Sequence, residues 1–255
     1  RRRNTVKTKL FFDRYNISIH GLMMQAKGEC AFVCRPPVKP EKPFLTPDRP
    51  WESMSVGWGT LMIENGLYRL WYEAWDKDYS HDCDGRLCYA QSTDGIKWEK
   101  PALGLVEYKG SRENNIVIDR KTVNGLGFHG HSIFIDPTSP PYARYRCVFL
   151  ANVPRPGYES MHIMSTAYSA DGLRWTWGAP DLPRDFLHTH TTAFGSDTQC
   201  VCRWDDELRK YVGYFRTWAP NGCRTIARSE TSALYDWPIP KTILSPDHLD
   251  AYNSD

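Results

Sequence analysis

The chain has 255 residues, of which 41% are hydrophobic and 13% aromatic, so it is long enough to bury one large core. Its 32 Lys and Arg nearly balance its 30 Asp and Glu, which gives a formal net charge of +2. This balance argues against charge-driven binding to nucleic acid or to a membrane surface, and no apolar run is long enough to cross a bilayer.

Short apolar runs follow one another along the chain in a pattern typical of strands and hairpins. The first group comprises residues 59–64, 67–72 and 86–90, and the second comprises residues 131–136, 145–150 and 163–167. A third group repeats the order at residues 199–203, 211–214 and 224–227. Turn residues separate these runs, and no long amphipathic helix is predicted.

The third run of each group leads into the same short phrase. Ser92–Trp98 returns 77 residues later as Ser169–Trp175, and a degenerate third copy, Ser229–Trp237, ends 62 residues after the second. Such a period indicates one supersecondary unit that is stacked repeatedly. Asp94 and Asp171 occupy the turn in successive copies, and a residue needed once for chemistry would not recur in every unit. We therefore predict that both are structural.

Antiparallel strands at this period, followed by an Asp-Gly turn and a packed tryptophan, predict a propeller blade. A β-sandwich is the alternative, but nothing in a sandwich requires the turn to repeat in step with the tryptophan. The expected organisation is an all-β propeller domain over residues 1–255, built of antiparallel four-stranded blades. It has a lead-in at 1–50, blades at roughly 55–100, 128–178 and 197–240, and the start of a further blade at 241–255.

Three blades are too few, because a propeller closes with about four to eight. We therefore expect the domain to be incomplete at its C-terminus, or its open edges to be covered by another copy.

The stretch Cys88–Pro101 carries the pattern Tyr-Ala-x-Ser-x-Asp-x-x-x-Trp, which resembles a signature of the five-bladed glycosidase propellers of glycoside hydrolase families 32, 43 and 68. A closer similarity is to a bacterial branch described as glycosyl hydrolase-like. It rests on residues 10–13, 50–52, 71–72, 103–107, 114–117 and 196–199. The resemblance implies a five-bladed propeller, of which about three blades are present, and an activity on glycans.

The chain departs from family 32 at the residues that carry its chemistry. It lacks the Trp-x-Asn-Asp-Pro nucleophile motif, and its Glu29-Cys30 precedes the first blade, so the acid role is not transferred. Phe134–Pro137 is superficially similar to the Arg-Asp-Pro motif, but Asp136 aligns with the turn positions of the other units and is predicted to be a turn residue. A sialidase is disfavoured because Gly95 directly follows Asp94. A WD-repeat interaction scaffold is disfavoured because the repeats lack its Gly-His and Trp-Asp pairs.

The innermost strand of each blade lines the central channel, and loops at its leading end form a funnel. Superposing the units places residues 52–57, 129–132 and 197–199 at the mouth of this channel. Because glycoside hydrolysis needs two carboxyl groups, Glu52 and Asp197 are the predicted catalytic pair, and Asp250 is a third candidate. The alternatives are that Glu52 starts a strand and that Asp197 forms an Asx turn.

Histidines cluster near the same mouth. His129 and His131 open the second inner strand, where side chains two residues apart share a face, and His190 lies in the loop before the third. A contact with sugar hydroxyls or a structural role is favoured over a metal site, because no nearby carboxylate completes a ligand set.

Three further side chains are candidates for substrate binding. Trp58 and Trp218 are expected to stack on a sugar ring, and packing in the core is the alternative. Arg216 is expected to orient an acidic or polyhydroxylated ligand through its planar guanidinium, and a salt bridge within the blade is its alternative.

These patterns together favour a glycoside hydrolase acting on a glycan or oligosaccharide in the funnel, with a non-catalytic carbohydrate-binding propeller as the alternative. We expect a carbohydrate partner, no nucleic acid, no membrane, no cofactor and no metal, since no cysteine pair has zinc-site spacing. Cys83 with Cys88 is the one local disulfide considered. The compartment and the oligomeric state stay open.

Overall fold

The computed structural model describes residues 39–81, 83–155, 158–180, 196 and 199–246. Its contacts divide the chain into two compact units, residues 1–42 and residues 43–255, and every strand named below belongs to the second unit. In the described ranges the helical content is limited to two single turns of 3-10 helix, Pro50–Glu52 and Pro141–Ala143. None of the helices in these ranges is long and apolar enough to cross a membrane.

The strands form three antiparallel sheets of four strands each. The first contains β1 (Ser55–Glu64), β2 (Leu67–Trp75), β3 (Arg86–Ser92) and β4 (Ile116–Ile118). The second contains β5 (His129–Ile135), β6 (Tyr145–Arg155), β7 (Tyr158–Ser169) and β8 (Thr176–Trp177). The third contains β9 (Val201–Asp205), β10 (Lys210–Trp218), β11 (Arg224–Thr231) and β12 (Lys241–Leu244). Each sheet runs in chain order from its first strand to its fourth.

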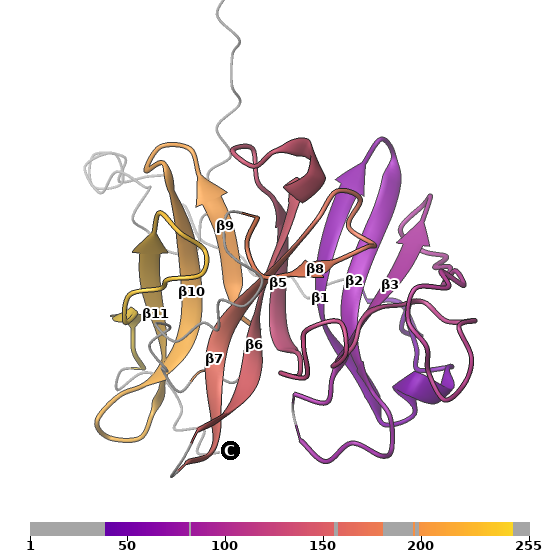
Figure 1. Ribbon diagram of the computed structural model, residues 1–255, viewed down its shortest axis with the longest axis horizontal. Coiled ribbons are helices and arrows are strands. Elements are labelled where there is room, and N and C mark those ends of the chain that lie inside the picture. Colours follow the sequence, from indigo (N-terminus) through magenta and orange to yellow (C-terminus); the bar gives the residue numbers. More distant parts are fainter. Residues whose placement is uncertain (1–38, 82, 156–157, 181–195, 197–198, 247–255) are drawn as a thin grey trace, which may run out of the picture. The chain divides into compact units, whose positions relative to one another are not determined.

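The first strands of neighbouring sheets contact each other, β1 with β5 and β5 with β9, and Figure 1 shows the second sheet between the other two. One hydrophobic cluster joins the first two sheets and includes Trp71 and Phe149. A second cluster joins the second and third sheets and includes Met164 and Trp237. First strands that meet, with sheets packed face to face behind them, are the arrangement of propeller blades.

Two of the three fourth strands, β4 and β12, lie outside the predicted blade limits, whereas β8 lies inside the second blade as predicted. β4 follows the predicted end of the first blade at residue 100, and β12 pairs with β11 as the outermost strand of the third sheet. Residues 241–244 therefore complete the third blade, whereas the sequence predicted that they begin another. The reason is that strands of three or four residues carry too little periodic pattern to be recognised before their pairing is known.

The repeated phrase forms the same hydrogen-bonded turn in the first two blades. Ser92 Oγ accepts the backbone N–H of Gly95, Asp94 Oδ1 accepts two later N–H groups, and Trp98 Nε1 donates to the Gly95 carbonyl at 3.2 Å. The second copy repeats every one of these bonds from Ser169, Asp171, Gly172 and Trp175. The prediction that both aspartates are structural is consistent with these bonds, because each Asp oxygen holds its own backbone.

The third copy begins two residues later than its sequence suggested. Thr231 Oγ1 accepts the N–H of Ala233, and Trp237 Nε1 donates to the Leu234 carbonyl at 2.8 Å. Thr231 thus stands where the other copies have serine, and Ser229 lies within β11 instead. The turn survives without its aspartate because a threonine hydroxyl makes the same local bond.

Asp136 is a turn residue, as predicted, and it also joins two blades. Its Oδ1 accepts the N–H of Thr138 at 2.9 Å, while the Tyr211 hydroxyl donates to its Oδ2 at 2.6 Å. Burial, the largest influence, raises the pKa of Asp136, but hydrogen bonds led by that of Tyr211 outweigh it and lower the pKa. Burial and the Asp136 contact raise the pKa of Tyr211 to about 12.

We expect Tyr211→Phe to lower the free energy of unfolding by about 1.5–3 kcal/mol at neutral pH, the usual contribution of a hydrogen bond to a charged group. Because the pKa of Asp136 is lowered by folding, this contribution is fully present above the ordinary aspartate pKa of about 3.9 and is lost as the pH falls through the folded-state value. Urea unfolding at several pH values measures it. Tyr214→Phe in the same strand is the control, and equal losses in both variants would contradict the role of the Asp136 contact.

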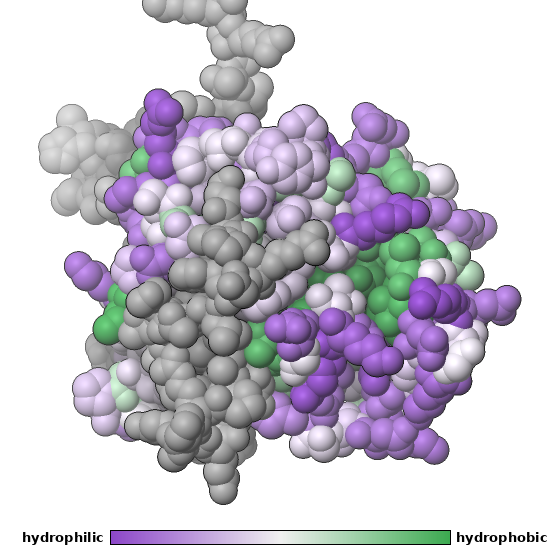
Figure 2. Space-filling view, viewed as in Figure 1, coloured by the Kyte–Doolittle hydropathy of each residue, from purple (hydrophilic) through white to green (hydrophobic). Residues whose placement is uncertain are grey.

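The face drawn in Figure 2 is hydrophilic over most of its area, with hydrophobic side chains gathered over the region of β2 and β3.

Cys83 and Cys88 are both free and buried, so the disulfide considered between them does not form in this structure. Burial raises the pKa of the Cys88 thiol well above its ordinary value, which keeps it protonated and unreactive.

Candidate functional site

Two inner strands are irregular at the end where they begin. β1 has a bulge between Gly57 and Gly59, and Trp58 within it has a φ of 28°, which is rare for a residue with a side chain. β5 shifts register between His129 and Ser132. Bulges re-aim side chains, and strained backbone of this kind costs about 1–3 kcal/mol and gathers at functional sites. We call this end of β1, β5 and β9 the mouth.

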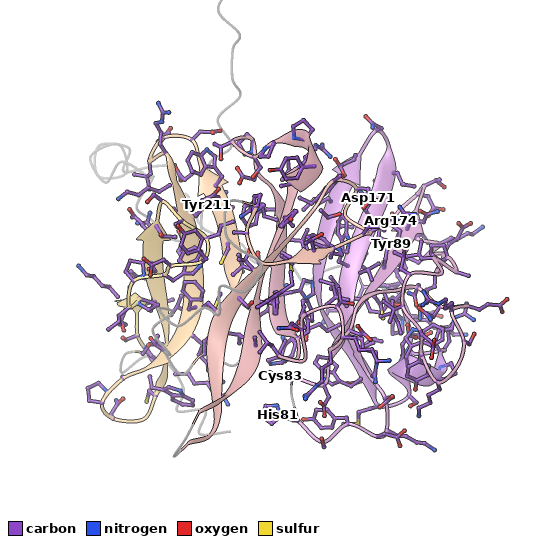
Figure 3. The ribbon with its side chains drawn as sticks, in the orientation of Figure 1. His81, Cys83, Tyr89, Asp171, Arg174 and Tyr211 are labelled. Carbon is purple, nitrogen blue, oxygen red and sulfur yellow. The ribbon has the colours of Figure 1, made fainter. Side chains whose placement is uncertain are left out.

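Figure 3 helps to locate the mouth. The labelled Cys83 lies at the lower end of the sheets, and its carbonyl accepts the N–H of Phe128, the residue before β5. The labelled Tyr211 and Asp171 lie at the opposite end. The mouth is therefore separated from the repeated turns.

A buried carboxylate connects the first two blades at the mouth. Glu73, from β2, accepts contacts from His129 Nδ1 at 3.2 Å and from His131 Nδ1 at 3.0 Å, and its Oε1 also accepts the His131 N–H at 3.1 Å. All three side chains are almost completely buried. Both rings reach one carboxylate because residues two apart on β5 share a face, as the sequence predicted.

The charge of Glu73 fixes the tautomer of both rings. Burial is the largest single influence and raises the pKa of Glu73. The hydrogen bonds to His129 and His131, together with the charges of these rings, outweigh it, so the pKa of Glu73 is lowered overall. An ionised carboxylate can only accept, so Nδ1 of each ring is the donor in these contacts. Carboxylate-oriented histidines of this kind serve as hydrogen-bond partners and as bases.

Aromatic rings surround the histidines. Trp58 meets His129 edge to face at a centroid distance of 4.7 Å and meets Trp75 at 5.5 Å, while Phe128 stacks on His131 at 5.7 Å. Trp58 is 39% exposed and Trp75 only 7%. Trp58 therefore presents a ring to solvent directly above the His129–Glu73 pair, as the prediction of a sugar-stacking side chain requires.

The third blade is tied to this centre through its leading residues. Gln199 Nε2 donates to the carbonyls of Gly59 and His131, each at 3.2 Å. The Cys200 N–H donates to the Gly130 carbonyl at 3.0 Å. These bonds bring the leading ends of all three inner strands together, so residues from three distant parts of the sequence meet at the mouth.

Glu52 lies elsewhere, and its predicted placement at the mouth is corrected by the structure. It is fully buried, accepts the Tyr72 hydroxyl at 2.6 Å and is ion-paired with Lys100 Nζ at 2.6 Å. Tyr72 and Glu73 are successive residues of β2, whose side chains point to opposite faces of the sheet. Glu52 is therefore on the other face of β2 from the histidines.

Two further carboxylates follow β2 near the mouth, and the sequence did not single them out. Asp76 contacts Arg86 at 3.3 Å and Asp84 contacts Arg120 at 2.7 Å. Burial, the largest influence, raises the pKa of Asp84, but hydrogen bonds from Ser80 and other contacts outweigh it and lower the pKa. Both carboxylates hold loops in place through these contacts.

Trp218 and Arg216 extend beyond the last pair between β10 and β9, at the mouth end of the third sheet. Trp218 is 48% exposed, and the guanidinium carbons of Arg216 and Arg224 lie 4.9 and 5.6 Å from its ring centroid. The structure thus places an exposed aromatic ring beside two cations, as substrate contact would require.

Asp197, Asp250 and His190 lie outside the described residues. Of the predicted site residues within those limits, His129, His131 and Trp58 are brought together, Trp218 and Arg216 lie on the third blade, and Glu52 is on the far face of β2. Among the described residues no group of three or more His, Cys, Asp or Glu is arranged to hold a metal ion.

The sequence analysis missed Glu73, which organises the mouth. Nothing local marks it as more important than Arg69, the other charged residue of β2, because its partners are 56 and 58 residues away. The available signal was its position: the second half of β2, Leu70–Trp75, is aromatic and apolar apart from Glu73, and a carboxylate there must find a partner if the strand is buried.

No protein-family profile matches the chain, and no curated protein matches it in sequence. Solved structures do resemble it. A β-fructofuranosidase from Schwanniomyces occidentalis, complexed with fructosyl-erythritol, is 15% identical with a TM-score of 0.51, over 79% of this chain and 36% of that one. A β-1,2-mannobiose phosphorylase from Listeria innocua, in complex with β-1,2-mannobiose, is 12% identical with a TM-score of 0.50, over 82% of this chain and 50% of that one.

At such identities the likeness concerns the fold alone, and the chain spans about a third and a half of the length of these two proteins. Its three sheets match part of the five-bladed β-propeller fold shared by glycoside hydrolases and phosphorylases. The predicted fold class, an all-β five-bladed propeller represented by about three blades, is thereby confirmed.

Proposed function

We propose that this protein is a glycoside hydrolase that binds a glycan or oligosaccharide at the mouth. The observation that carries the proposal is the exposed, strained Trp58 above the carboxylate-oriented His129, where the leading ends of three inner strands meet. An exposed aromatic ring is a surface on which a sugar can stack, and the buried His129 beneath it contacts Trp58 edge to face and so supports its position.

Asp197 and Asp250 are the proposed catalytic carboxyl groups. Glu52 is ion-paired and Glu73 is enclosed, so neither is free to act on a glycosidic bond directly. Asp197 precedes Gln199, whose side chain bonds the inner strands of the first two blades. One group would protonate the leaving oxygen and the other would attack or activate water, with a separation of about 5 Å for retention and about 6.5–9.5 Å for inversion.

His129, His131 and His190 are proposed to contact sugar hydroxyls or to shape the pocket that does so. Trp58 and Trp218 supply stacking surfaces, and Arg216 supplies a planar donor for a carboxylate or a pair of hydroxyls. The second candidate function is carbohydrate binding without catalysis. It is favoured because Glu52, one of the two predicted catalytic carboxylates, is held in an ion pair with Lys100, so the described residues do not supply the pair of carboxylates that hydrolysis needs.

A screen of oligosaccharides with the intact protein tests the proposal, and each reaction is run with and without inorganic phosphate. We expect hydrolysis that does not depend on phosphate and that falls at least a hundredfold in Asp197→Asn, within the range of general acid and base catalysis. Equal turnover in both proteins would remove Asp197 from the site. Glycan binding with no turnover would establish the second candidate, and sugar-phosphate products would indicate phosphorolysis instead.

Trp58→Ala is expected to weaken glycan binding about 30-fold, or about 2 kcal/mol, as is typical for a central tryptophan in a binding site. Isothermal titration calorimetry measures the affinity. Ile96→Ala is the control, since Ile96 is 58% exposed in the turn that follows β3, at the opposite end of the sheet. An unchanged affinity in Trp58→Ala would exclude Trp58 as a stacking surface.

A further inference from the structure

The hairpin between β10 and β11 carries the side chains of the third blade that lie nearest the mouth. β10 pairs with β9 from Lys210 as far as Tyr214, and from Phe215 to Trp218 it pairs with β11 alone. In Figure 1 the loop that joins the two strands lies at the lower end of the third sheet, the end at which Figure 3 labels Cys83. The last residues of β10 and the first of β11 therefore lie beside the mouth.

A tight turn holds these two strand ends in register. The Gly222 N–H donates to the Ala219 carbonyl and the Ala219 N–H donates to the Cys223 carbonyl, both at 2.9 Å. Gly222 has a φ of +82°, the left-handed conformation that closes a three-residue hairpin loop. Trp218 and Arg224, the strand pair next to this turn, are thus held opposite each other before any ligand binds.

Strand alternation puts three arginines on one side of the hairpin. Arg216 in β10 and Arg224 and Arg228 in β11 are exposed or half-buried, whereas Thr225 and Ala227, which alternate with them, are buried. Residues that pair directly across an antiparallel ladder share a face, and the register of β10 with β11 aligns the arginines of the two strands in this way. The three guanidinium groups therefore share the open face of the third sheet.

Two of these cations lie against one exposed indole. The guanidinium carbons of Arg216 and Arg224 are 4.9 and 5.6 Å from the ring centroid of Trp218, which is 48% exposed. A cation within about 6 Å of a tryptophan ring is attracted to its face, but two cations at one ring repel each other. An anion bound beside the ring would relieve that repulsion. We call Arg216, Trp218 and Arg224 the arginine corner.

The acid of the same strand is too distant to neutralise Arg224. Glu230 shares its side of β11, but it is six residues away, which is about 20 Å along a strand. Glu230 instead contacts Arg228 at 2.9 Å and Lys210 at 3.5 Å. Among the residues that the structure describes, no carboxylate comes within ion-pair distance of Arg224. The positive charge of Arg224 is therefore uncompensated within this part of the chain.

The chemistry of the arginine corner favours a sugar that carries a negative charge. A guanidinium donates two parallel hydrogen bonds to a pair of oxyanion oxygens, and such bonds are about twice as strong as those between neutral groups. An exposed indole offers a flat surface to the sugar ring itself. A neutral sugar would use the indole but would leave the charge of Arg224 without a partner.

We propose that the arginine corner binds an anionic substituent of the glycan, a uronate carboxylate or a sulfate ester, while the sugar ring that bears it stacks on Trp218. This inference rests on the proposed function, because it takes a glycan to be bound at the mouth, and it adds that the glycan is acidic. Arg224 supplies the uncompensated charge, and Arg216 supplies a second guanidinium on the same ring.

Binding to oligosaccharides prepared in pairs tests the proposal. Oligogalacturonate and oligomannuronate are each compared with their carboxyl-reduced counterpart, and a sulfated galactan oligosaccharide with its desulfated counterpart, by isothermal titration calorimetry at low and high salt. We expect the acidic member of a pair to bind about tenfold more tightly, the effect of one hydrogen bond between charged groups, and this preference to shrink at high salt. The pair that shows the preference distinguishes a carboxylate from a sulfate.

Arg224→Gln removes the charge and keeps a polar side chain at an exposed position. We expect it to weaken binding of the acidic member about tenfold, to leave the neutral member unaffected and to flatten the salt dependence. Arg224→Lys should recover part of the loss, because it restores the charge without the planar fork. Arg209→Gln is the matched control, since Arg209 is an exposed arginine in the turn before β10, at the other end of the sheet.

The outcomes separate this proposal from the proposed function. Equal affinities for the acidic and neutral members, or equal losses for both in Arg224→Gln, would overturn the acidic-glycan proposal and leave glycan binding at the mouth intact. A loss in Arg209→Gln as large as that in Arg224→Gln would also overturn it, because the preference would then reflect the overall surface charge. Binding of none of the six oligosaccharides would contradict both the proposal and the proposed function.

Discussion

Gly172→Ala is expected to lower the free energy of unfolding by about 2–6 kcal/mol. Gly172 has a φ of +75°, where a side chain adds about 1–3 kcal/mol of backbone strain. An added Cβ would also lie 2.8 Å from Trp71 and 3.1 Å from Arg69, and forcing an extra methyl group into such packing adds about 1–3 kcal/mol. Chemical denaturation followed by tryptophan fluorescence measures the change.

The chain supplies a matched control in the equivalent turn of the first blade. Gly95 has nearly the same φ, +73°, and the same bond to the preceding serine, but its nearest contact is the Tyr68 ring at 3.2 Å. We expect Gly95→Ala to lose only the backbone term and a small part of the packing term. Equal losses at the two glycines would contradict the prediction. They would show that the contacts of Gly172 with Trp71 and Arg69 leave no less room for a methyl group than the contact of Gly95 with Tyr68.

Glu73→Ala is expected to destabilise the protein by about 3–5 kcal/mol, the typical result of removing one member of a buried polar network. It would leave the Nδ1 groups of His129 and His131 and the His131 N–H without the acceptor that now holds them. Buried donors without partners cost about 1–3 kcal/mol each. Glu73→Gln preserves the volume and one acceptor, so a smaller loss is expected.

Glycan affinity measured on the folded fraction of Glu73→Gln distinguishes a positioning residue from a merely structural one. If Glu73 orients His129, affinity falls even where the protein remains folded, and its pH dependence changes because the imidazole is released. Glu113→Ala, at an exposed loop position, controls for the loss of a negative charge. A variant that is destabilised but binds glycan normally would limit Glu73 to holding the first two blades together.

The local features of this fold could be predicted from the sequence. The Ser-x-Asp-Gly turn was recognised in the first two blades because its bonds join residues within three positions of one another. The third copy was misaligned at Ser229 because Thr231 and Ala233 replace the recognisable serine and aspartate. The same principle explains why the short strand β4 was missed and why the residues of β12 were assigned to a further blade, since the place of such strands depends on pairing and not on pattern.

The candidate site was only partly predictable. His129 and His131 were expected to share a face, and both rings contact the same carboxylate, while their role in binding stays a prediction. Glu52 was misplaced because proximity in sequence to β1 does not determine which face of β2 it packs against, and its ion pair with Lys100 spans 48 residues. Glu73 was overlooked for the same reason, because a single carboxylate in a strand shows its importance only when distant partners meet it.

The sequence by itself determined the repeating unit, the strand-rich architecture and the turn chemistry, because these follow from contacts between near neighbours and from a period of two along each strand. The tertiary structure alone decided which carboxylate meets the histidines, which tyrosine reaches which turn, and which face of the third sheet stays open. Those outcomes depend on the register and packing of sheets that are dozens of residues apart, and no local pattern encodes that alignment.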